Sequence, residues 1–160
     1  MDRLVPQLDG VHHLKLPVRD LDRSSEWFQS RLGYATAMEF REDGKVMGLA
    51  LNHPDGGPRL ALRLDPAKAA ASAGFDFFSI GVPTKAALDA LSARLTRLGD
   101  THSGVRIASL GWILPGLSDP DGHEIRFYTT ESHQNAPEGQ VYIVDNARSA
   151  GKHAGMEGSP

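Results

Sequence analysis

Cysteine is absent from the 160-residue sequence. The chain can therefore form no disulfide, no thiolate metal site and no cysteine nucleophile. Apolar runs approaching the ~20 residues that cross a bilayer are also missing, and the first six residues, MDRLVP, lack the apolar core of a signal peptide. These absences argue against a membrane partner and predict a cytoplasmic location.

Neither sign of charge dominates the sequence. The formal net charge is −3, and no run of Lys or Arg occurs anywhere along the chain. A nucleic-acid partner is not expected, because phosphate backbones are bound by clustered basic residues. Hydrophobic residues at 40% and charged residues at 23% are typical of a soluble globular protein, and 160 residues suit a single domain.

Two stretches carry most of the information. The first, VHHLKLPVRDL at residues 11–21, joins an alternating strand to a helix predicted at Asp22–Leu32, which ends at Gly33. The second, DPDGHEIRFY at residues 119–128, joins a turn to another alternating strand. Asp-Gly and Pro-Asp-Gly sequences between apolar runs indicate tight turns.

The same order of elements occurs twice. The first half predicts the helix at Asp22–Leu32 and strands at Val11–Val18, Ala35–Phe40, Gly44–Leu51 and Pro58–Leu64. A helix-prone linker, Pro66–Gly74, leads into the second half. That half predicts a helix at Thr84–Leu98 and strands at Phe77–Val82, Ser103–Ile107, Gly111–Leu117 and Glu124–Thr129. Thr84 is expected to cap its helix, and Gly33 and Gly99 to end theirs. The pattern predicts an α+β fold of two tandem βαβββ modules.

The two stretches and the repeated order resemble the vicinal oxygen chelate superfamily, also called the glyoxalase, bleomycin-resistance and extradiol dioxygenase family. The resemblance covers about residues 9–131, with modules at about 9–65 and 75–131. It implies a curved mixed sheet around a ligand cavity. Residues 132–160 form a C-terminal extension, in which Gln140–Val144 is predicted as a short strand and Asp145–Pro160 as disordered.

Strand alternation divides the side chains between two faces. One set is expected to lie under the helices: Leu14, Leu16, Val18, Phe78, Ile80, Val82, Ile125 and Phe127. The opposite set would line the cavity that the resemblance implies: His13, Lys15, Phe77, Ser79, Glu124, Arg126 and Tyr128, with Trp112 or Ile113 from a neighbouring strand. His123 precedes the last strand and does not fall at one of its cavity-facing positions, so it is expected at the surface.

In the family's enzymes, His and Glu side chains from several strands hold a divalent metal. His13 stands at the first of these positions, whereas the others fall on Phe77, on Arg126 and on either Ala61 or Arg63. An apolar ring and a guanidinium cannot coordinate a cation. The usual metal site is therefore expected to be absent, and no cofactor is expected. The fallback ligands are His13 and Glu124, and further potential donors are His12, Asp76 and His102.

Aromatic walls with a few polar groups are typical of a pocket for an organic ligand. Lys15 and Arg126 could bind an anionic group, while Phe77, Tyr128 and Trp112 could stack on a planar one. One function that follows is a metal-free protein that binds and sequesters a drug or metabolite, as a homodimer like its family relatives.

The alternative is an enzyme of the same superfamily. It would be a metal-dependent lyase, epimerase or ring-cleaving dioxygenase, or else a cofactor-free isomerase or cyclase. In the cofactor-free case His13 would act as the general base, and Lys15 with Arg126 would stabilise a developing oxyanion.

Overall fold

The computed structural model describes residues 5–135, 139, 141, 143 and 144. The first module contains β1 (Leu14–Val18), α1 (Leu21–Leu32), β2 (Ala35–Glu42), β3 (Lys45–Asn52) and β4 (Leu60–Leu64). A short helix, α2 (Pro66–Ser72), leads to the second module, which contains β5 (Ser79–Val82), α3 (Lys85–Arg97), β6 (Arg106–Ile107), β7 (Trp112–Ser118) and β8 (Glu124–Thr129). The predicted α+β class and the two βαβββ modules are confirmed. Among the described residues, no helix has the length and hydropathy needed to cross a membrane.

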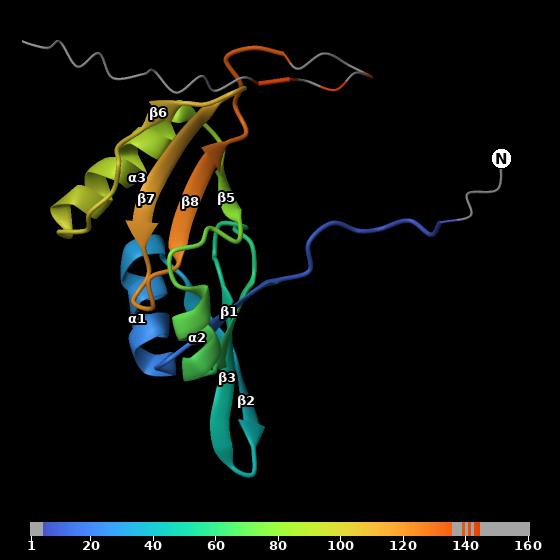
Figure 1. Ribbon diagram of the computed structural model, residues 1–160, viewed down its shortest axis with the longest axis vertical. Coiled ribbons are helices and arrows are strands. Elements are labelled where there is room, and N and C mark those ends of the chain that lie inside the picture. Colours follow the sequence, from blue (N-terminus) through green and yellow to red (C-terminus); the bar gives the residue numbers. More distant parts are fainter. Residues whose placement is uncertain (1–4, 136–138, 140, 142, 145–160) are drawn as a thin grey trace, which may run out of the picture.

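Each module forms its own four-stranded sheet. The strand orders are β1-β4-β3-β2 and β5-β8-β7-β6. In both sheets the first strand runs parallel to the last one of its module, and the remaining pairs are antiparallel. The two sheets do not join, so β1 and β5 are edge strands (Figure 1). One curved sheet closing around a cavity is therefore not formed within the described chain.

The helices begin and end at residues whose chemistry suits those positions. The side chain of Asp20 accepts a hydrogen bond from the N–H of Arg23 and caps α1, and Gly33 ends this helix at φ 82°. Thr84 caps α3 by accepting from the N–H of Ala87 at 3.1 Å. Gly99, with φ of 83°, follows the end of α3 in the left-handed conformation. The predicted roles of Thr84, Gly33 and Gly99 are confirmed.

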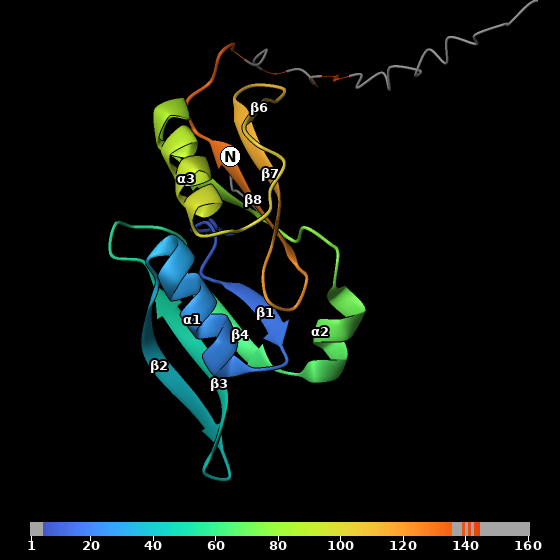
Figure 2. The ribbon, with the colours of Figure 1, turned by 90° about the vertical axis from the view of Figure 1, so that its left-hand side faces the viewer.

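Both long helices lie on the same side of the molecule (Figure 2). α1 packs on β2, β3 and β4, and α3 packs on β5, β7 and β8, while α2 lies beside β1. The side chains beneath the helices form one apolar core, whose largest fully buried members include Leu16, Leu62, Phe28, Leu114 and Phe127. Strand alternation thus placed the core face of both sheets correctly.

Four predicted strands, those of β1, β4, β5 and β6, are shorter in the structure. β1 begins at Leu14, because its partner β4 starts only after Pro58 and pairs from Leu60 onward. β5 begins at Ser79, opposite Arg126, and β6 retains only two residues. The strand predicted at Gln140–Val144 lies partly outside the described residues, and 145–160 lies wholly outside them.

Candidate ligand-binding face

Each sheet has one face that points away from the helices, its open face. On the first sheet, register brings residues of four strands into two rows. Lys15, Ala61, Ala50 and Met38 form one row, and Pro17, Arg63, Gly48 and Phe40 form the other. Met38 and Phe40 are exposed, and a Cβ on Gly48 would lie 3.7 Å from the Phe40 ring. The first open face is thus largely apolar.

On the second sheet, the open face is more polar. Ser79 lies opposite Arg126, and Gly81 lies opposite Tyr128. The Tyr128 hydroxyl is 3.2 Å from the hydroxyl oxygen of Ser109. The structure therefore brings together Ser79, Glu124, Arg126 and Tyr128, as strand alternation predicted for β5 and β8.

Of the two alternatives on β7, Ile113 belongs to this face and Trp112 does not. Ile113 pairs with Tyr128, whereas Trp112 pairs with Ile107 and packs partly buried against the core. Its ring also contacts the ring of His133, with centroids 5.4 Å apart. Of the two alternatives, the register of β7 therefore places Ile113 on the open face and Trp112 on the side of the core residue Leu114, which pairs with Phe127.

The charge of Arg126 is already compensated within the protein. One of its terminal nitrogens lies 3.0 Å from Asp76 and the other 3.0 Å from Glu124. The second carboxylate oxygen of Glu124 accepts the N–H of Gly116 at 2.8 Å. The hydrogen bond from Arg126 lowers the pKa of Glu124, and the same bond raises the pKa of Arg126. Glu124 is consequently held as an anion and is a poor general base. The charge of Arg126 is largely neutralised by its two carboxylate partners, so Arg126 would attract an anionic ligand only weakly.

Lys15 and Phe77 meet in a pocket of about 370 Å³ between β1 and α2. The other lining residues are Leu16, Pro17, Lys68, Ala71 and Ser72. The side chain of Lys15 is exposed and has no hydrogen-bond or ion-pair partner in the part of the chain that the structure describes. Phe77 is half-exposed, with its ring centroid 4.8 Å from that of Phe75. This pocket has apolar walls and one uncompensated cation.

The histidines at the start of the first stretch lie outside β1. His12 and His13 are exposed, and their Nδ1 atoms lie 2.9 Å apart. Within residues 5–135 and the four described positions beyond them, no three His, Asp or Glu side chains are close enough together to hold a metal ion. Asp76 precedes β5, so strand alternation does not decide which way its side chain points. Its carboxylate forms an ion pair with Arg126 rather than contributing to a metal site.

His123 is buried, and its expected position at the surface is wrong. It is 0% exposed, and its Nδ1 atom lies 2.8 Å from a carboxylate oxygen of Asp119. On the other side of the ring, Nε2 lies 2.8 Å from the hydroxyl oxygen of Ser72 in α2. The parity argument failed here because His123 belongs to a turn that α2 covers.

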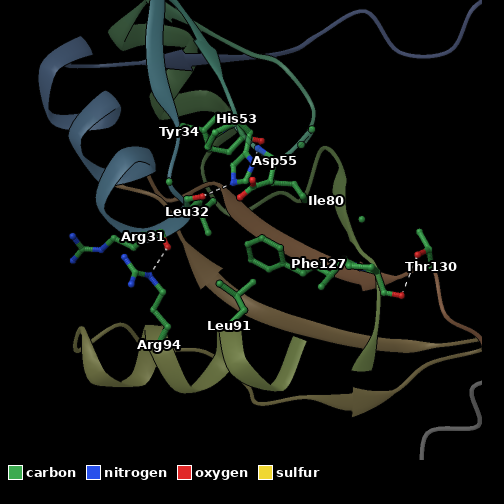
Figure 3. Close-up of a pocket in the computed structure, with 17 residues that line it drawn as sticks. Arg31, Leu32, Tyr34, His53, Asp55, Ile80, Leu91, Arg94, Phe127 and Thr130 are labelled. Carbon is green, nitrogen blue, oxygen red and sulfur yellow. Dashed lines mark hydrogen bonds between the residues drawn. The ribbon is translucent and has the colours of Figure 1, made fainter. Parts of the chain in front are cut away.

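A larger pocket of about 690 Å³ lies between the two modules (Figure 3). Its apolar lining includes Leu32, Ile80, Leu91 and Phe127, of which strand alternation had placed Ile80 and Phe127 in the core. The cations at its rim already have partners. Arg31 pairs with Asp100 at 3.1 Å, and Arg94 donates to the carbonyl oxygens of Ser30 and Arg31. Sequence reasoning missed this pocket because it depends on how the modules pack, and no local pattern encodes that packing.

The profile of the Glyoxalase/Bleomycin resistance protein/Dioxygenase superfamily matches residues 10–127. The chain belongs to this superfamily. The expected resemblance is thereby confirmed for most of the chain. No curated protein matches the sequence significantly.

Solved structures of the superfamily fold are also similar to this protein. A glyoxylase/bleomycin resistance protein/dioxygenase domain from Frankia sp. EAN1pec is 25% identical, with a TM-score of 0.61 over 77% of this chain and 98% of its own. TnmS3, an antibiotic binding protein from Streptomyces sp. CB03234, is 19% identical, with a TM-score of 0.61 over 78% and 98%. A lactoylglutathione lyase from Agrobacterium tumefaciens is 14% identical, with a TM-score of 0.62 over 78% and 96%. The last two similarities concern the fold alone.

Proposed function

We propose that this protein binds a small anionic molecule with an aromatic or otherwise apolar body, without a metal ion, in order to sequester it in the cytoplasm. The observation that carries the proposal is the position of Lys15 in an apolar pocket. Lys15, whose ammonium group is unpaired among the described residues, lines a pocket whose other lining residues include Pro17 and Phe77. An organic anion placed there would find one cation and an apolar surface, the combination typical of small-molecule sites.

The residues at the positions where the family's enzymes carry metal ligands favour binding over metal-dependent catalysis. Two positions where the family's enzymes carry ligands hold Phe77 and Arg126 here. Arg126 is held by two carboxylates, and a permanently charged guanidinium repels a metal cation. TnmS3, which shares the fold, is an antibiotic binding protein, so this fold is compatible with a binding function.

We further propose that a second copy of the chain completes the binding cleft. The edge strands β1 and β5 carry backbone groups with no partner strand on one side, which is the usual route to pairing between chains. Met38, Phe40, Phe75 and Phe77 expose between 51% and 58% of their surface, and Met38 and Phe40 lie on the first open face. Covering them would remove apolar surface from water, at about 25 cal/mol per Å².

The binding proposal is tested with 8-anilinonaphthalene-1-sulfonate, an anionic aromatic probe. Its Kd is measured by fluorescence titration for the wild type, for Lys15→Gln and for the matched control Lys45→Gln, which removes an exposed cation at the tip of the β2–β3 hairpin. We expect Lys15→Gln to weaken binding about tenfold, equivalent to about 1.4 kcal/mol, and Lys45→Gln to leave it unchanged. Equal affinities in all three proteins would contradict the proposal.

Two further measurements separate the parts of the proposal. Elemental analysis of protein purified without added metal or chelator tests the metal-free state, and stoichiometric Fe, Mn, Ni, Zn or Co would favour the enzyme alternative. Light scattering after gel filtration tests the dimer. Phe40→Asp should then shift the wild-type dimer toward monomer. Ile107→Asp, at an apolar position that is 76% exposed and lies opposite Trp112 in the second sheet, should not.

A further inference from the structure

Three side chains, Ser72 from α2 and Asp119 and His123 from the turn before β8, form a hydrogen-bonded chain beside the pocket of Lys15 and Phe77. The Ser72 hydroxyl oxygen lies 2.8 Å from His123 Nε2, and His123 Nδ1 lies 2.8 Å from a carboxylate oxygen of Asp119. From this arrangement we infer an acyl-transfer site, in which Ser72 is the nucleophile, His123 the general base and Asp119 the residue that orients the base. The substrate class is a small carboxylic ester. This activity goes beyond the proposed binding function, and although both use the pocket of Lys15 and Phe77, it rests on Ser72, His123 and Asp119.

Asp119 fixes the state of the histidine ring. One oxygen of its carboxylate accepts the backbone N–H groups of Asp121 and His123 at 3.0 and 2.9 Å, and the other faces His123 Nδ1. A carboxylate can only accept, so we assign a hydrogen to Nδ1, and the tautomer with its hydrogen there has a lone pair at Nε2. That lone pair points at the Ser72 hydroxyl, which is the arrangement that activates a serine for attack.

Ser72 connects this buried chain to the solvent. His123 is 0% exposed and Asp119 is 5% exposed, whereas Ser72 is half-buried and lines the 370 Å³ pocket. The ring of Phe77 lies against that of His123, with centroids 6.1 Å apart, and contributes to the pocket wall. An ester with an apolar acyl group fits these walls, and Lys15, which lines the same pocket, supplies positive charge for a developing oxyanion.

The same three residues also hold α2 in place. Beside them, the N–H of Gly74 donates to the carbonyl oxygen of Gly122 at 2.7 Å, so the end of α2 is tied to the turn before β8. The single hydroxyl hydrogen of Ser72 can be donated either to His123 Nε2 or back to the Lys68 carbonyl oxygen, each 2.8 Å away. A purely structural bond would leave Ser72 with ordinary reactivity. Reactivity is therefore the property that separates the two roles.

The proposed reaction has two steps. Ser72 Oγ bonds to the acyl carbon as its proton passes to His123 Nε2. When the carbon–oxygen bond to the alcohol breaks, the leaving oxygen takes that proton. Water then attacks the acyl-serine in the same way, giving its proton to Nε2, and Ser72 Oγ recovers a proton as the acid is released.

The first test is labelling of the intact wild-type chain with a fluorophosphonate probe, read by mass spectrometry and peptide mapping. We expect one adduct, on Ser72. Ser72→Ala should abolish it and should lower p-nitrophenyl acetate hydrolysis by about 100-fold, within the range for nucleophilic and acid–base catalysis. The matched control is Ser25→Ala, which removes another helical serine bonded to a carbonyl, 3.1 Å from Asp22 O, and which should change neither readout.

A second variant uses the absence of cysteine. Ser72→Cys and Ser25→Cys each introduce a single thiol into the chain. If His123 Nε2 takes the proton at position 72, iodoacetamide should alkylate that thiol rapidly at pH 6. The thiol at position 25 should instead follow an ordinary thiol pKa of about 8.5. Absence of a wild-type adduct, an adduct that persists in Ser72→Ala, or identical pH profiles for the two thiols would each overturn the inference.

Discussion

Asp121 accepts a hydrogen bond from the backbone N–H of Arg19 at 3.1 Å, across 102 positions of sequence. Its second carboxylate oxygen accepts from the hydroxyl of Ser24 at 3.3 Å. Asp121 is only 4% exposed, and Ser24 lies in the first turns of α1. The Asp119–His123 turn of the second module is thereby fixed to the start of the helix of the first module.

Replacing Asp121 should destabilise the protein substantially. Asp121→Ala would leave the Arg19 N–H and the Ser24 hydroxyl without their acceptor, and Ser24 is buried. We expect a loss of about 2–3 kcal/mol in the free energy of unfolding, measured by urea denaturation. Asp89→Ala is the control, because it removes only the half-exposed pair with Lys85 and should cost about 0.5 kcal/mol or less. Equal losses in the two variants would contradict this assignment.

Gly111 occupies a position that no side chain can fill. A Cβ there would collide with Thr129 Oγ1 and would lie 2.7 Å from the carbonyl oxygen of Glu131. The Thr129 hydroxyl cannot move freely, because it accepts the N–H of Trp112 at 2.9 Å and donates to Glu131 O at 2.7 Å. Gly111→Ala should therefore cost about 1–3 kcal/mol, with a lower thermal midpoint. Gly81→Ala, whose new Cβ would lie 3.7 Å from Thr130, should change stability far less.

Local patterns predicted the fold because each depends on neighbours along the chain. Alternation identified Leu16, Val18, Ile125 and Phe127 as core residues, and each is at most 2% exposed. The helix limits followed from Thr84 and from the glycines that end the helices. These features need no knowledge of which strand pairs with which.

The site could be predicted only in part, because its details depend on long-range pairing. Trp112 and Ile113 are adjacent in sequence, and only the register with β8 decides which one faces outward. The burial of His123 depends on Ser72, 51 positions away. Asp76 neutralises part of the Arg126 charge from a segment that precedes β5. None of these contacts leaves a periodic signal in the sequence.

The Arg126–Glu124 pair should contribute stability only above acidic pH. Arg126 lowers the folded-state pKa of Glu124 below its ordinary value of 4.5. The contribution is therefore complete above the unfolded-state pKa and is lost as pH falls through the folded-state value. At pH 7 we expect Arg126→Gln to lower the free energy of unfolding, measured by urea denaturation, by about 1 kcal/mol. This difference from the wild type should shrink toward pH 3. A difference that stayed constant with pH would show that packing, not charge, is lost. Arg41→Gln, which breaks a more exposed pair with Glu39, serves as the control.

Tyr34 should resist ionisation until strongly alkaline pH. The residue is 2% exposed, its hydroxyl donates to the Pro58 carbonyl oxygen at 2.8 Å, and burial raises its pKa to about 12. Because the folded-state pKa lies above the ordinary value of 10.0, the neutral phenol is favoured by folding. Its contribution to stability is thus complete below pH 10 and is lost between about pH 10 and 12, where only the unfolded chain ionises. Subtracting the 295 nm absorbance titration of Tyr34→Phe from that of the wild type should isolate a step near pH 12, provided circular dichroism shows that both remain folded. A step near pH 10 in the folded protein would mean that the Tyr34 hydroxyl is open to water.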